Sequence, residues 1–462
     1  MQDLKNLSQK NRFSNIKPFS TGGNNRRLKP KVGTGRSRLP MPSGKRLQHL
    51  KLTLIFLAAV LALTPVCIAT VKLSGETWKH VSGWLASFSE STPKPVEAAK
   101  PPNTPSNFEL AGNLLENANA NGDHLTAVSP EGLHFNYTIQ GGLQKRVYDF
   151  LAKNKVPYGV FVAIEPATGR ILGMTSYSSV DPSWTKSSAY GLYPMASLFK
   201  IITASAALES GKLTPESVIE FRGGSTSESP KYWEISHRGK NNRQDVTHAM
   251  GKSINPVYGR IASDIAGKAS VMESVSRFGF NQKLFKGIPA KPSQATEPHS
   301  NNDLMLMGAG LNHDVKISPL HAAVIMSAIA NGGRMMTPTL TTSILDNKGH
   351  EKETFVPQEA RRLVTSETAS SLTKMLSSTV RTGTSRKAFH DRRGRPLIDV
   401  EIAAKTGSIN GSDPKGHYSW FAAFAPLQNP QIALVALVIN PDKWKIKASQ
   451  VGQQALEEFF EK

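Results

Sequence analysis

The chain has 462 residues, enough for two or three domains at roughly 150 residues each. Its 39% of hydrophobic and 20% of charged residues argue against a wholly disordered chain and against a membrane protein with many spans. The single cysteine, Cys67, excludes an internal disulfide framework and a cysteine-rich zinc or iron–sulfur site. The net charge is +21, and residues 1–51 carry +12 of it, because 13 lysines and arginines stand there beside one acid. The basic character is therefore mainly a property of the N-terminal tail.

The first 71 residues are predicted to be a tail and a membrane anchor. Residues 1–51 are polar and lack apolar periodicity, so we expect a disordered tail. Residues 52–71 (LTLIFLAAVLALTPVCIATV) carry no charge, and a helix of about 20 residues crosses a bilayer core of ~30 Å. Few lysines follow this run, so the positive-inside rule predicts a single-pass protein with a cytoplasmic N-terminus and an extracytoplasmic (periplasmic) remainder.

Two alternatives apply to this N-terminal part. A cleavable signal peptide would need an n-region of 51 residues, which is long for one. The basic tail could contact nucleic acid, but attraction to the anionic headgroups of the cytoplasmic (inner) membrane is the simpler explanation, so no nucleic-acid partner is expected.

A change of composition marks the boundary of the folded part. Residues 72–131 contain a juxtamembrane segment and a stretch rich in proline and serine, which predicts a spacer. The folded domain is predicted to span residues 132–462. Strands are predicted at residues 133–139, 158–165, 171–177, 402–408, 420–425 and 432–439. Helices are predicted at residues 143–154, 195–209 and 448–461, with further helix-like segments in the middle of the chain. This order predicts an α+β fold, in which both ends of the domain form one antiparallel sheet, a helical subdomain is inserted between them, and a single transmembrane helix precedes the domain.

The first candidate site motif is Ser197-Leu198-Phe199-Lys200 at the start of the predicted helix 195–209. A spacing of three places the hydroxyl and the amine on one helix face. Serine is a poor nucleophile unless a base lies within about 3 Å, and lysine is a base only when its pKa is lowered by burial or by a second cation. This short pattern is common by chance.

Two further motifs follow in order. Ser253-Ile254-Asn255 offers a hydroxyl that can relay a proton and an amide that can hold a peptide group. Lys405-Thr406-Gly407-Ser408 lies at the end of an apolar predicted strand, where the lysine and two hydroxyls favour an anion and the glycine lets a substrate backbone approach. The joint occurrence of all three motifs is far more specific than any one of them.

The three motifs resemble the signature of the acyl-serine penicillin-recognising enzymes. Further segments resemble the transpeptidase domain of monofunctional, class B-like penicillin-binding proteins: YGVFVAIEPATGRILGMTSYSSVDP, GKSINPVYGRIA, ISPLHAAVIMSAIANGG, RTGTSRKAF and SWFAAFAP. The resemblance covers residues 135–439 and implies the penicillin-binding transpeptidase/β-lactamase-like fold.

The resemblance also implies roles for the motif residues. Ser197 would attack the D-alanyl-D-alanine end of a peptidoglycan stem peptide and become acylated, while Lys200 takes its proton. Ser253 and Lys405 would pass a proton to the departing D-alanine. The implied substrate-binding residues are Asn255, Thr406, Gly407 and Ser408, with the backbone N–H groups of Ser197 and Ser408 as the oxyanion hole.

The implied activity is that of a membrane-anchored D,D-transpeptidase that cross-links peptidoglycan and is acylated by β-lactam antibiotics. No cofactor or metal is expected, and a separate glycosyltransferase is the expected partner for glycan polymerisation. A D,D-carboxypeptidase or β-lactamase that uses water as acceptor stays open, as does a non-catalytic scaffold or β-lactam sensor. Glu297 resembles the deacylating glutamate of class A β-lactamases, but its spacing from the other motifs fits poorly. His417 is expected at the surface, with a place at the rim of the cleft as the alternative.

Overall fold

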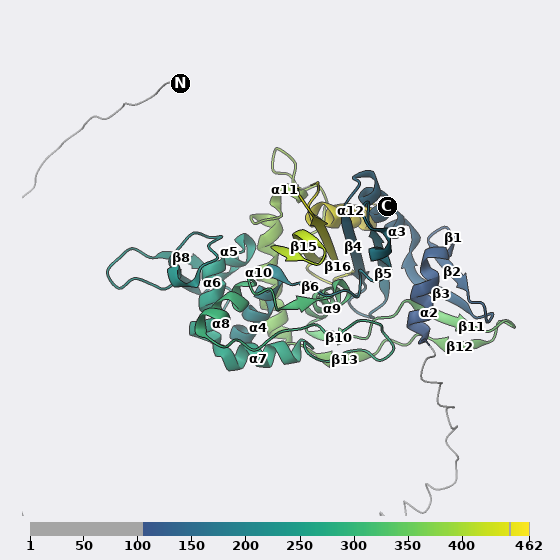
Figure 1. Cartoon of the computed structure of the whole chain (residues 1–462), viewed down its shortest axis with the longest axis horizontal. Helices are drawn as coiled ribbons and strands as arrows, with labels where there is room; N and C mark the ends of the chain where they lie inside the picture. Colours follow the sequence, from purple (N-terminus) through teal and green to yellow (C-terminus); the bar gives the residue numbers. More distant parts are fainter. Residues whose placement is uncertain (1–104, 443–444, 462) are drawn as a thin grey trace, which may run out of the picture. The chain divides into compact units, whose positions relative to one another are not determined.

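The computed structural model describes residues 105–442 and 445–461 (Figure 1). The predicted tail, membrane span and most of the predicted spacer lie outside these residues. Within the described part, no helix combines the length and the apolar character needed to cross a bilayer.

The central element is a five-stranded antiparallel sheet with the order β14-β15-β16-β4-β5 (Figure 1). Its strands are β4 (Tyr158–Ile164), β5 (Ile171–Tyr177), β14 (Ala403–Ser412), β15 (Lys415–Ala425) and β16 (Ile432–Asn440). Since β4 and β5 come early in the domain and the other three come late, the predicted α+β sheet built from both ends of the domain is confirmed.

Helices cover both faces of this sheet because its central strands are apolar throughout. Every residue of β16 is buried. Its alternate residues Leu434, Ala436 and Val438 face α12 (Ala448–Phe460), and α3 (Gly141–Lys153) packs beside α12 over β5. The intervening residues of β16 face α9 (Pro319–Ala330), a helix that is buried on all sides. A strand that is buried on both faces has a continuous run of hydrophobic residues, and β16 has such a run.

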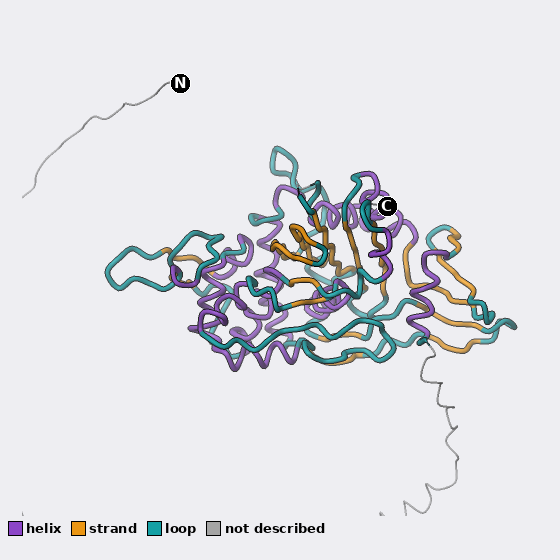
Figure 2. The backbone as a smooth tube through the Cα atoms, viewed as in Figure 1, coloured by secondary structure: helices purple, strands orange, loops and turns teal. Residues whose placement is uncertain are grey.

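Helices dominate the middle of the chain, as predicted, and form the region at the left of Figure 2. Its helices are α4 (Lys200–Glu209), α5 (Val246–Lys252), α6 (Asn255–Arg260), α7 (Gly267–Arg277), α8 (Asn301–Ala309) and α10 (Ser366–Arg381), after which the short α11 (Arg386–Phe389) packs against α12. Short strand pairs connect them: β6 (Tyr193–Pro194) with β9 (Lys316–Ile317), β7 (Val218–Phe221) with β8 (Asn242–Asp245), and β10 (Arg334–Met336) with β13 (Glu359–Arg362).

A second five-stranded sheet differs from the prediction. Its order is β1-β2-β3-β11-β12, formed by β1 (Asn119–Asn121), β2 (His124–Val128), β3 (His134–Gln140), β11 (Thr341–Leu345) and β12 (Glu351–Thr354). The strand predicted at residues 133–139 therefore belongs to this sheet and not to the central one. Alternation of apolar and polar residues along a strand indicates that one face of the strand is buried, but it does not show with which sheet the strand pairs.

The start of the folded part also differs from the predicted boundary at residue 132. Residues that were predicted to be spacer form α2 (Asn107–Leu114), β1 and β2. Ser106 caps α2, and the buried residues Ala111, Leu125 and Ala127 join the core. Short, polar strands such as β1 carry little apolar signal, so composition alone does not separate them from a linker.

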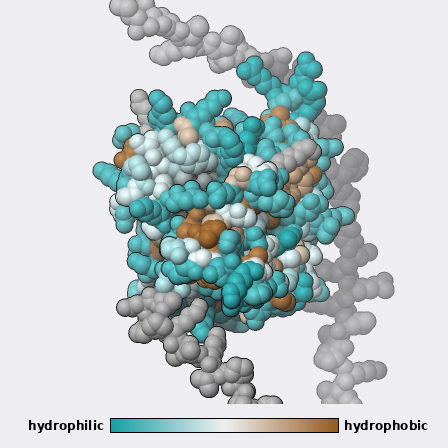
Figure 3. All heavy atoms as spheres, turned by 90° about the vertical axis from the view of Figure 1, so that its right-hand side faces the viewer, coloured by the Kyte–Doolittle hydropathy of each residue, from teal (hydrophilic) through white to brown (hydrophobic). Residues whose placement is uncertain are grey.

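The end of the molecule that carries the second sheet is mostly hydrophilic at its surface (Figure 3). The exposed hydrophobic side chains there include Val128 and Val356, and only small hydrophobic areas interrupt the polar surface in this view. Isolated exposed hydrophobic residues are ordinary on a soluble domain, so this face indicates no particular binding site.

Candidate active site

The three sequence motifs converge at the edge of the central sheet. Ser197 lies in a single 3₁₀ turn (Ala196–Phe199) that leads directly into α4, so the predicted helix 195–209 begins with this tighter turn. Ser253 and Asn255 lie at the junction of α5 and α6. The Lys-Thr-Gly-Ser motif occupies the first half of the edge strand β14, and not the end of a strand as predicted, because β14 continues to Ser412.

The nucleophile turn is held close to the edge strand by small residues. Ala196 has a positive φ of 53°. A Cβ added at Gly407 would lie 3.1 Å from the Ala196 Cβ, and one added at Gly310 would lie 2.2 Å from the Ala196 carbonyl oxygen. Trp420 Nε1 also donates to the Pro194 carbonyl over 2.9 Å. The approach of the turn to β14 and to the end of α8 thus requires glycine at both positions.

Lys200 is bound to three oxygens. Its Nζ lies 2.8 Å from Ser197 Oγ, 2.8 Å from Asn255 Oδ1 and 2.5 Å from the Ala309 carbonyl oxygen. Asn255 Nδ2 donates to the Ser227 carbonyl over 3.3 Å, which fixes the direction of the Asn255 amide. Its Oδ1 therefore faces the amine.

These partners decide what a neutral Lys200 can do. A neutral amine has two hydrogens and one lone pair, and the Asn255 and Ala309 oxygens can only accept. Both N–H groups are therefore directed to those two oxygens, and the lone pair is left facing the Ser197 hydroxyl. This is the geometry of a general base.

Electrostatics favour that neutral form. The Lys200 side chain is fully buried, and burial together with the nearby Lys405 ammonium lowers the pKa of Lys200 well below the usual value for lysine. Desolvation penalises a charged group, and a like charge adds to the penalty. The second cation proposed from the sequence is thus present in the structure.

Lys405 forms the second pair of the site. Its Nζ lies 2.8 Å from Ser253 Oγ and 2.8 Å from the Thr406 carbonyl oxygen. Burial lowers the pKa of Lys405 to about 7. Ser253 adopts the left-handed conformation, with φ 57° and ψ 43°, at the C-terminal cap of α5. An amine that titrates near neutral pH can both accept and return a proton.

Three of the predicted substrate-binding residues, Thr406, Gly407 and Ser408, lie on the edge strand β14, while Asn255 is buried beside Lys200. Among the residues that the structure describes, β14 pairs with no strand other than β15, so its other edge can pair with an extended peptide. Thr406 Oγ1 lies 2.6 Å from Thr384 Oγ1, Gly407 is buried against the nucleophile turn, and Ser408 is exposed. A cleft of about 320 Å³ opens beside Ser408.

Helix α10 links the elements that carry the three motifs. It packs against α4, α5 and β14. At its C-terminal end, Ser378 Oγ donates to the Thr247 carbonyl over 2.7 Å, and Thr384 N donates to the Gly251 carbonyl over 3.0 Å. Such contacts hold the Ser253 turn against the helix.

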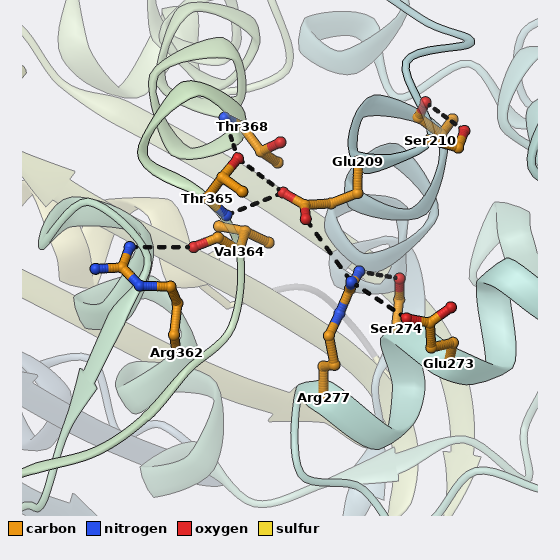
Figure 4. Close-up of polar contacts among 10 residues, drawn as sticks. Glu209, Ser210, Glu273, Ser274, Arg277, Arg362, Val364, Thr365 and Thr368 are labelled. Carbon is orange, nitrogen blue, oxygen red and sulfur yellow. Dashed lines mark hydrogen bonds and ion pairs between the residues drawn. The ribbon is translucent and has the colours of Figure 1, made fainter. Parts of the chain in front are cut away.

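The N-terminal end of α10 is joined to the C-terminal end of α4, the helix that follows the Ser197 turn (Figure 4). Glu209, the last residue of α4, accepts hydrogen bonds from Thr365 N at 2.9 Å and Thr365 Oγ1 at 3.0 Å. Arg277 of α7 pairs with the same carboxylate at 3.7 Å. Sequence reasoning missed Glu209, Thr384 and the Ala309 carbonyl, because none of them lies in a short motif.

Two other residues considered in the sequence, Glu297 and His417, lie outside the three motifs. Glu297 is exposed and pairs with Lys268 at 2.8 Å, which supports a solvated loop over a deacylating role. His417 is half-buried and lines the cleft beside Ser408, which is the alternative that the sequence left open beside a surface position. Within the described ranges, no group of three or more histidine, cysteine or acidic side chains is placed to hold a metal ion.

A serine that faces the lone pair of a buried lysine, beside an edge strand that carries a second lysine, defines an acyl-serine enzyme site. The family model for the penicillin binding protein transpeptidase domain matches residues 159–461, so the chain belongs to this family. This confirms the resemblance found in the motifs.

Characterised relatives are similar over most of the domain. Peptidoglycan D,D-transpeptidase PbpA of Mycobacterium tuberculosis is 28% identical over 354 residues, which cover 69% of this chain and 70% of that protein. Stage V sporulation protein D of Bacillus subtilis is 26% identical over 334 residues, which cover 67% of this chain and 50% of that protein.

Solved structures are similar in fold. A crystal structure of penicillin-binding protein A from M. tuberculosis superposes with a TM-score of 0.58 and 24% identity, covering 70% of this chain and 80% of that one. The ceftriaxone acyl-enzyme complex of the same protein gives a TM-score of 0.59 with 24% identity, covering 70% of this chain and 79% of that one. These similarities confirm the expected transpeptidase fold of the domain.

Proposed function

We propose that this chain is a D,D-transpeptidase that cross-links peptidoglycan stem peptides through an acyl-enzyme on Ser197. The observation that carries the proposal is the Ser197–Lys200 pair, in which two acceptor oxygens direct the lysine lone pair at the hydroxyl. Family membership supports the reaction class, and the relative PbpA carries the name peptidoglycan D,D-transpeptidase.

Acylation starts with proton transfer from Ser197 to Lys200. The Ser197 oxygen then attacks the penultimate D-alanine carbonyl, whose developing negative charge is met by the N–H groups of Ser197 and Ser408. The Ser253–Lys405 pair donates a proton to the nitrogen of the departing D-alanine. Asn255, Thr406 and Ser408 hold the peptide and its terminal carboxylate, while Gly407 leaves room for the peptide backbone.

Deacylation needs an amine. The amino group of a second stem peptide attacks the ester carbonyl, a C–N bond forms, and the C–O bond to Ser197 breaks. The proton lost by the amine returns to the Ser197 oxygen. A β-lactam acylates Ser197 in the same way. Because the leaving nitrogen of the opened ring stays attached to the acyl group, nothing departs to make room for the acceptor, and we expect a long-lived adduct.

The test is covalent labelling with a fluorescent penicillin. Ser197→Ala should lose labelling altogether, because the attacking oxygen is absent. The matched control is Ser210→Ala, which removes a hydroxyl at the C-terminal end of the same helix, where Oγ donates to the Ala207 carbonyl. Labelling that persists in Ser197→Ala would refute the assignment.

Analysis of the reaction products then distinguishes an amine acceptor from water. Cross-linked peptide dimers support the transpeptidase. Free D-alanine without dimers, or rapid release of the penicillin adduct, would favour a carboxypeptidase or a β-lactamase.

We also propose that the protein is anchored in the cytoplasmic membrane by residues 52–71, with the catalytic domain outside the cytoplasm. The support is the 20-residue uncharged run and the excess of positive charge before it. Glycan strands would then come from a separate glycosyltransferase. The test is protease treatment of spheroplasts, which should degrade the catalytic domain and leave a tag at the N-terminus intact. Protection of the domain would overturn this topology.

A further inference from the structure

One side chain of the connection between β7 and β8 is buried, although the connection itself is exposed. Residues 222–241 extend from the helical region at the left of Figure 1, and most of their side chains are exposed. Trp233 has no exposed surface. A buried tryptophan contributes a large hydrophobic contact and an N–H group that needs a partner, so it can fix an otherwise exposed connection to the domain.

The indole of Trp233 is hydrogen bonded to the residue that orients Asn255. Trp233 Nε1 donates to Ser227 Oγ over 2.9 Å, and the Ser227 carbonyl accepts from Asn255 Nδ2 over 3.3 Å. The Ser225 carbonyl accepts from Asn255 N over 2.9 Å. A carboxamide that turns by 180° presents its NH₂ group in place of its oxygen. The indole bond therefore holds the carbonyl that keeps Asn255 Oδ1, and not Nδ2, toward Lys200.

The same ring packs against the source of the second oxygen. Trp233, Met305 and Ala309 form a buried hydrophobic cluster, and Ala309 supplies the carbonyl oxygen that lies 2.5 Å from the catalytic amine. The ring also lies against α6, because a Cβ added at Gly259 would be 2.4 Å from the indole. Since α6 begins at Asn255 and α8 ends at Ala309, one ring contacts both helices that carry the acceptor oxygens.

Both oxygens that direct the lysine lone pair thus depend on one indole. We propose that Trp233 is a positioning residue for acylation, which keeps the two acceptor oxygens in place and so leaves the Lys200 lone pair directed at Ser197. Trp233 acts through Ser227 and Ala309 and is not itself a catalytic residue. This inference rests on the proposed function, because it needs Lys200 to be the base that accepts the Ser197 proton.

Two kinds of failure have opposite effects on the pKa of Lys200. If the Asn255 amide turns, a donor replaces an acceptor that stabilises the ammonium form, so the pKa of Lys200 falls further and the new N–H occupies the lone pair. If the site only loosens and admits water, desolvation decreases and the pKa rises toward the ordinary 10.5. The other titratable groups that face this amine are Lys405 and Tyr258, whose ring centre lies 5.9 Å from Lys200 Nζ. Both stay unchanged in the variants below.

The experiment measures the second-order rate constant of acylation by a fluorescent penicillin, with the full chain in detergent, from pH 5 to pH 9. Trp233→Phe keeps an aromatic ring but removes the N–H group, and Ser227→Ala removes the hydroxyl that accepts it while the backbone carbonyl stays. Both changes remove the bond that ties Ser227 to the buried ring, so its carbonyl should move away from Asn255 Nδ2.

Each variant should lower the rate constant at pH 7 by roughly tenfold to hundredfold, which is part of what a general base contributes. The rising limb of the pH profile should stay at the same pH or move to lower pH. The double variant should be about as slow as the slower single variant, because both substitutions remove the same hydrogen bond.

Two further variants serve as rescue and control. Ser227→Thr keeps the hydroxyl and should retain most of the wild-type rate. Ser229→Ala removes a half-buried hydroxyl of the same connection that makes no hydrogen bond within the described residues, so its rate should equal that of the wild type. Circular dichroism during urea unfolding establishes that each variant is folded in the assay. Ser227→Ala, at a half-buried position, keeps the test decisive if Trp233→Phe does not fold.

Three outcomes would overturn the inference. A folded Ser227→Ala variant that is acylated at the wild-type rate shows that the indole bond does not position the amine. A rising limb that moves to higher pH shows that Trp233 only excludes water. Multiplicative losses in the double variant show that the two residues act separately. The proposed function is tested independently, because loss of labelling in Ser197→Ala does not depend on Trp233 or Ser227.

Discussion

Replacement of Lys405 by methionine tests how strongly the active-site amine is desolvated. The Lys405 side chain has no exposed surface, and burial lowers its pKa from the ordinary 10.5 to about 7. Between these two values the unfolded chain keeps the proton and the folded chain has released it. Because the unfolded state then binds more protons, the free energy of unfolding rises with pH across this interval. The cost of burying the charged amine is present in full below pH 7 and is lost as the pH approaches 10.5.

The size of the effect follows from the same values. At 1.36 kcal/mol for each pH unit, the interval corresponds to about 5 kcal/mol, most of which falls between pH 7 and pH 10. Lys405→Met has no such proton to lose. The difference in unfolding free energy between wild type and variant should therefore move by roughly 3–4 kcal/mol in favour of the wild type from pH 7 to pH 10.

The assay is urea unfolding at pH 7, 8, 9 and 10, followed by the fluorescence of the buried Trp233 and Trp420. Lys348→Met, which removes an exposed lysine from a surface turn, is the control and should run parallel to the wild type. If Lys405→Met also runs parallel to the wild type, the buried amine does not titrate in this range. Lys405 would then not be a proton carrier near neutral pH.

Two further predictions concern the positioning of the nucleophile. Gly310→Ala should lower the unfolding free energy by about 2–4 kcal/mol and slow penicillin acylation, because the new Cβ would lie 2.2 Å from the Ala196 carbonyl oxygen at a φ of +71°. The control Gly332→Ala has a similar φ of +63° but open space around the Cβ, so it should cost only about 1 kcal/mol and leave acylation unchanged. Equal effects of the two substitutions would show that the close approach is unimportant. Glu209→Ala should lower the unfolding free energy by about 1–2 kcal/mol, since it removes two hydrogen bonds at the N-terminus of α10. Glu273→Ala, which removes only an exposed partner of Arg277, should change it by less than about 0.5 kcal/mol in the same urea titration.

The sequence by itself determined the chemical groups of the three motifs and many of the elements of this protein. The hydrophobic run of residues 432–439 predicts a strand, and β16 is that strand, buried along its whole length. The motif spacing from Ser197 to Lys200 is short enough for local geometry to bring hydroxyl and amine together, and they lie 2.8 Å apart. Local periodicity and short-range spacing depend on bond geometry within one element, so they can be inferred from the order of residues alone.

Only the tertiary structure decided what surrounds those groups. The carbonyl of Ala309, which helps to direct the Lys200 lone pair, is a backbone group and leaves no mark in the sequence. The lowered pKa values of Lys200 and Lys405 arise because separate parts of the chain exclude water from both amines. The pairing of β3 with β11 likewise depends on segments far apart in the chain. Desolvation and long-range pairing are properties of the packed assembly of elements, and no single stretch of residues contains them.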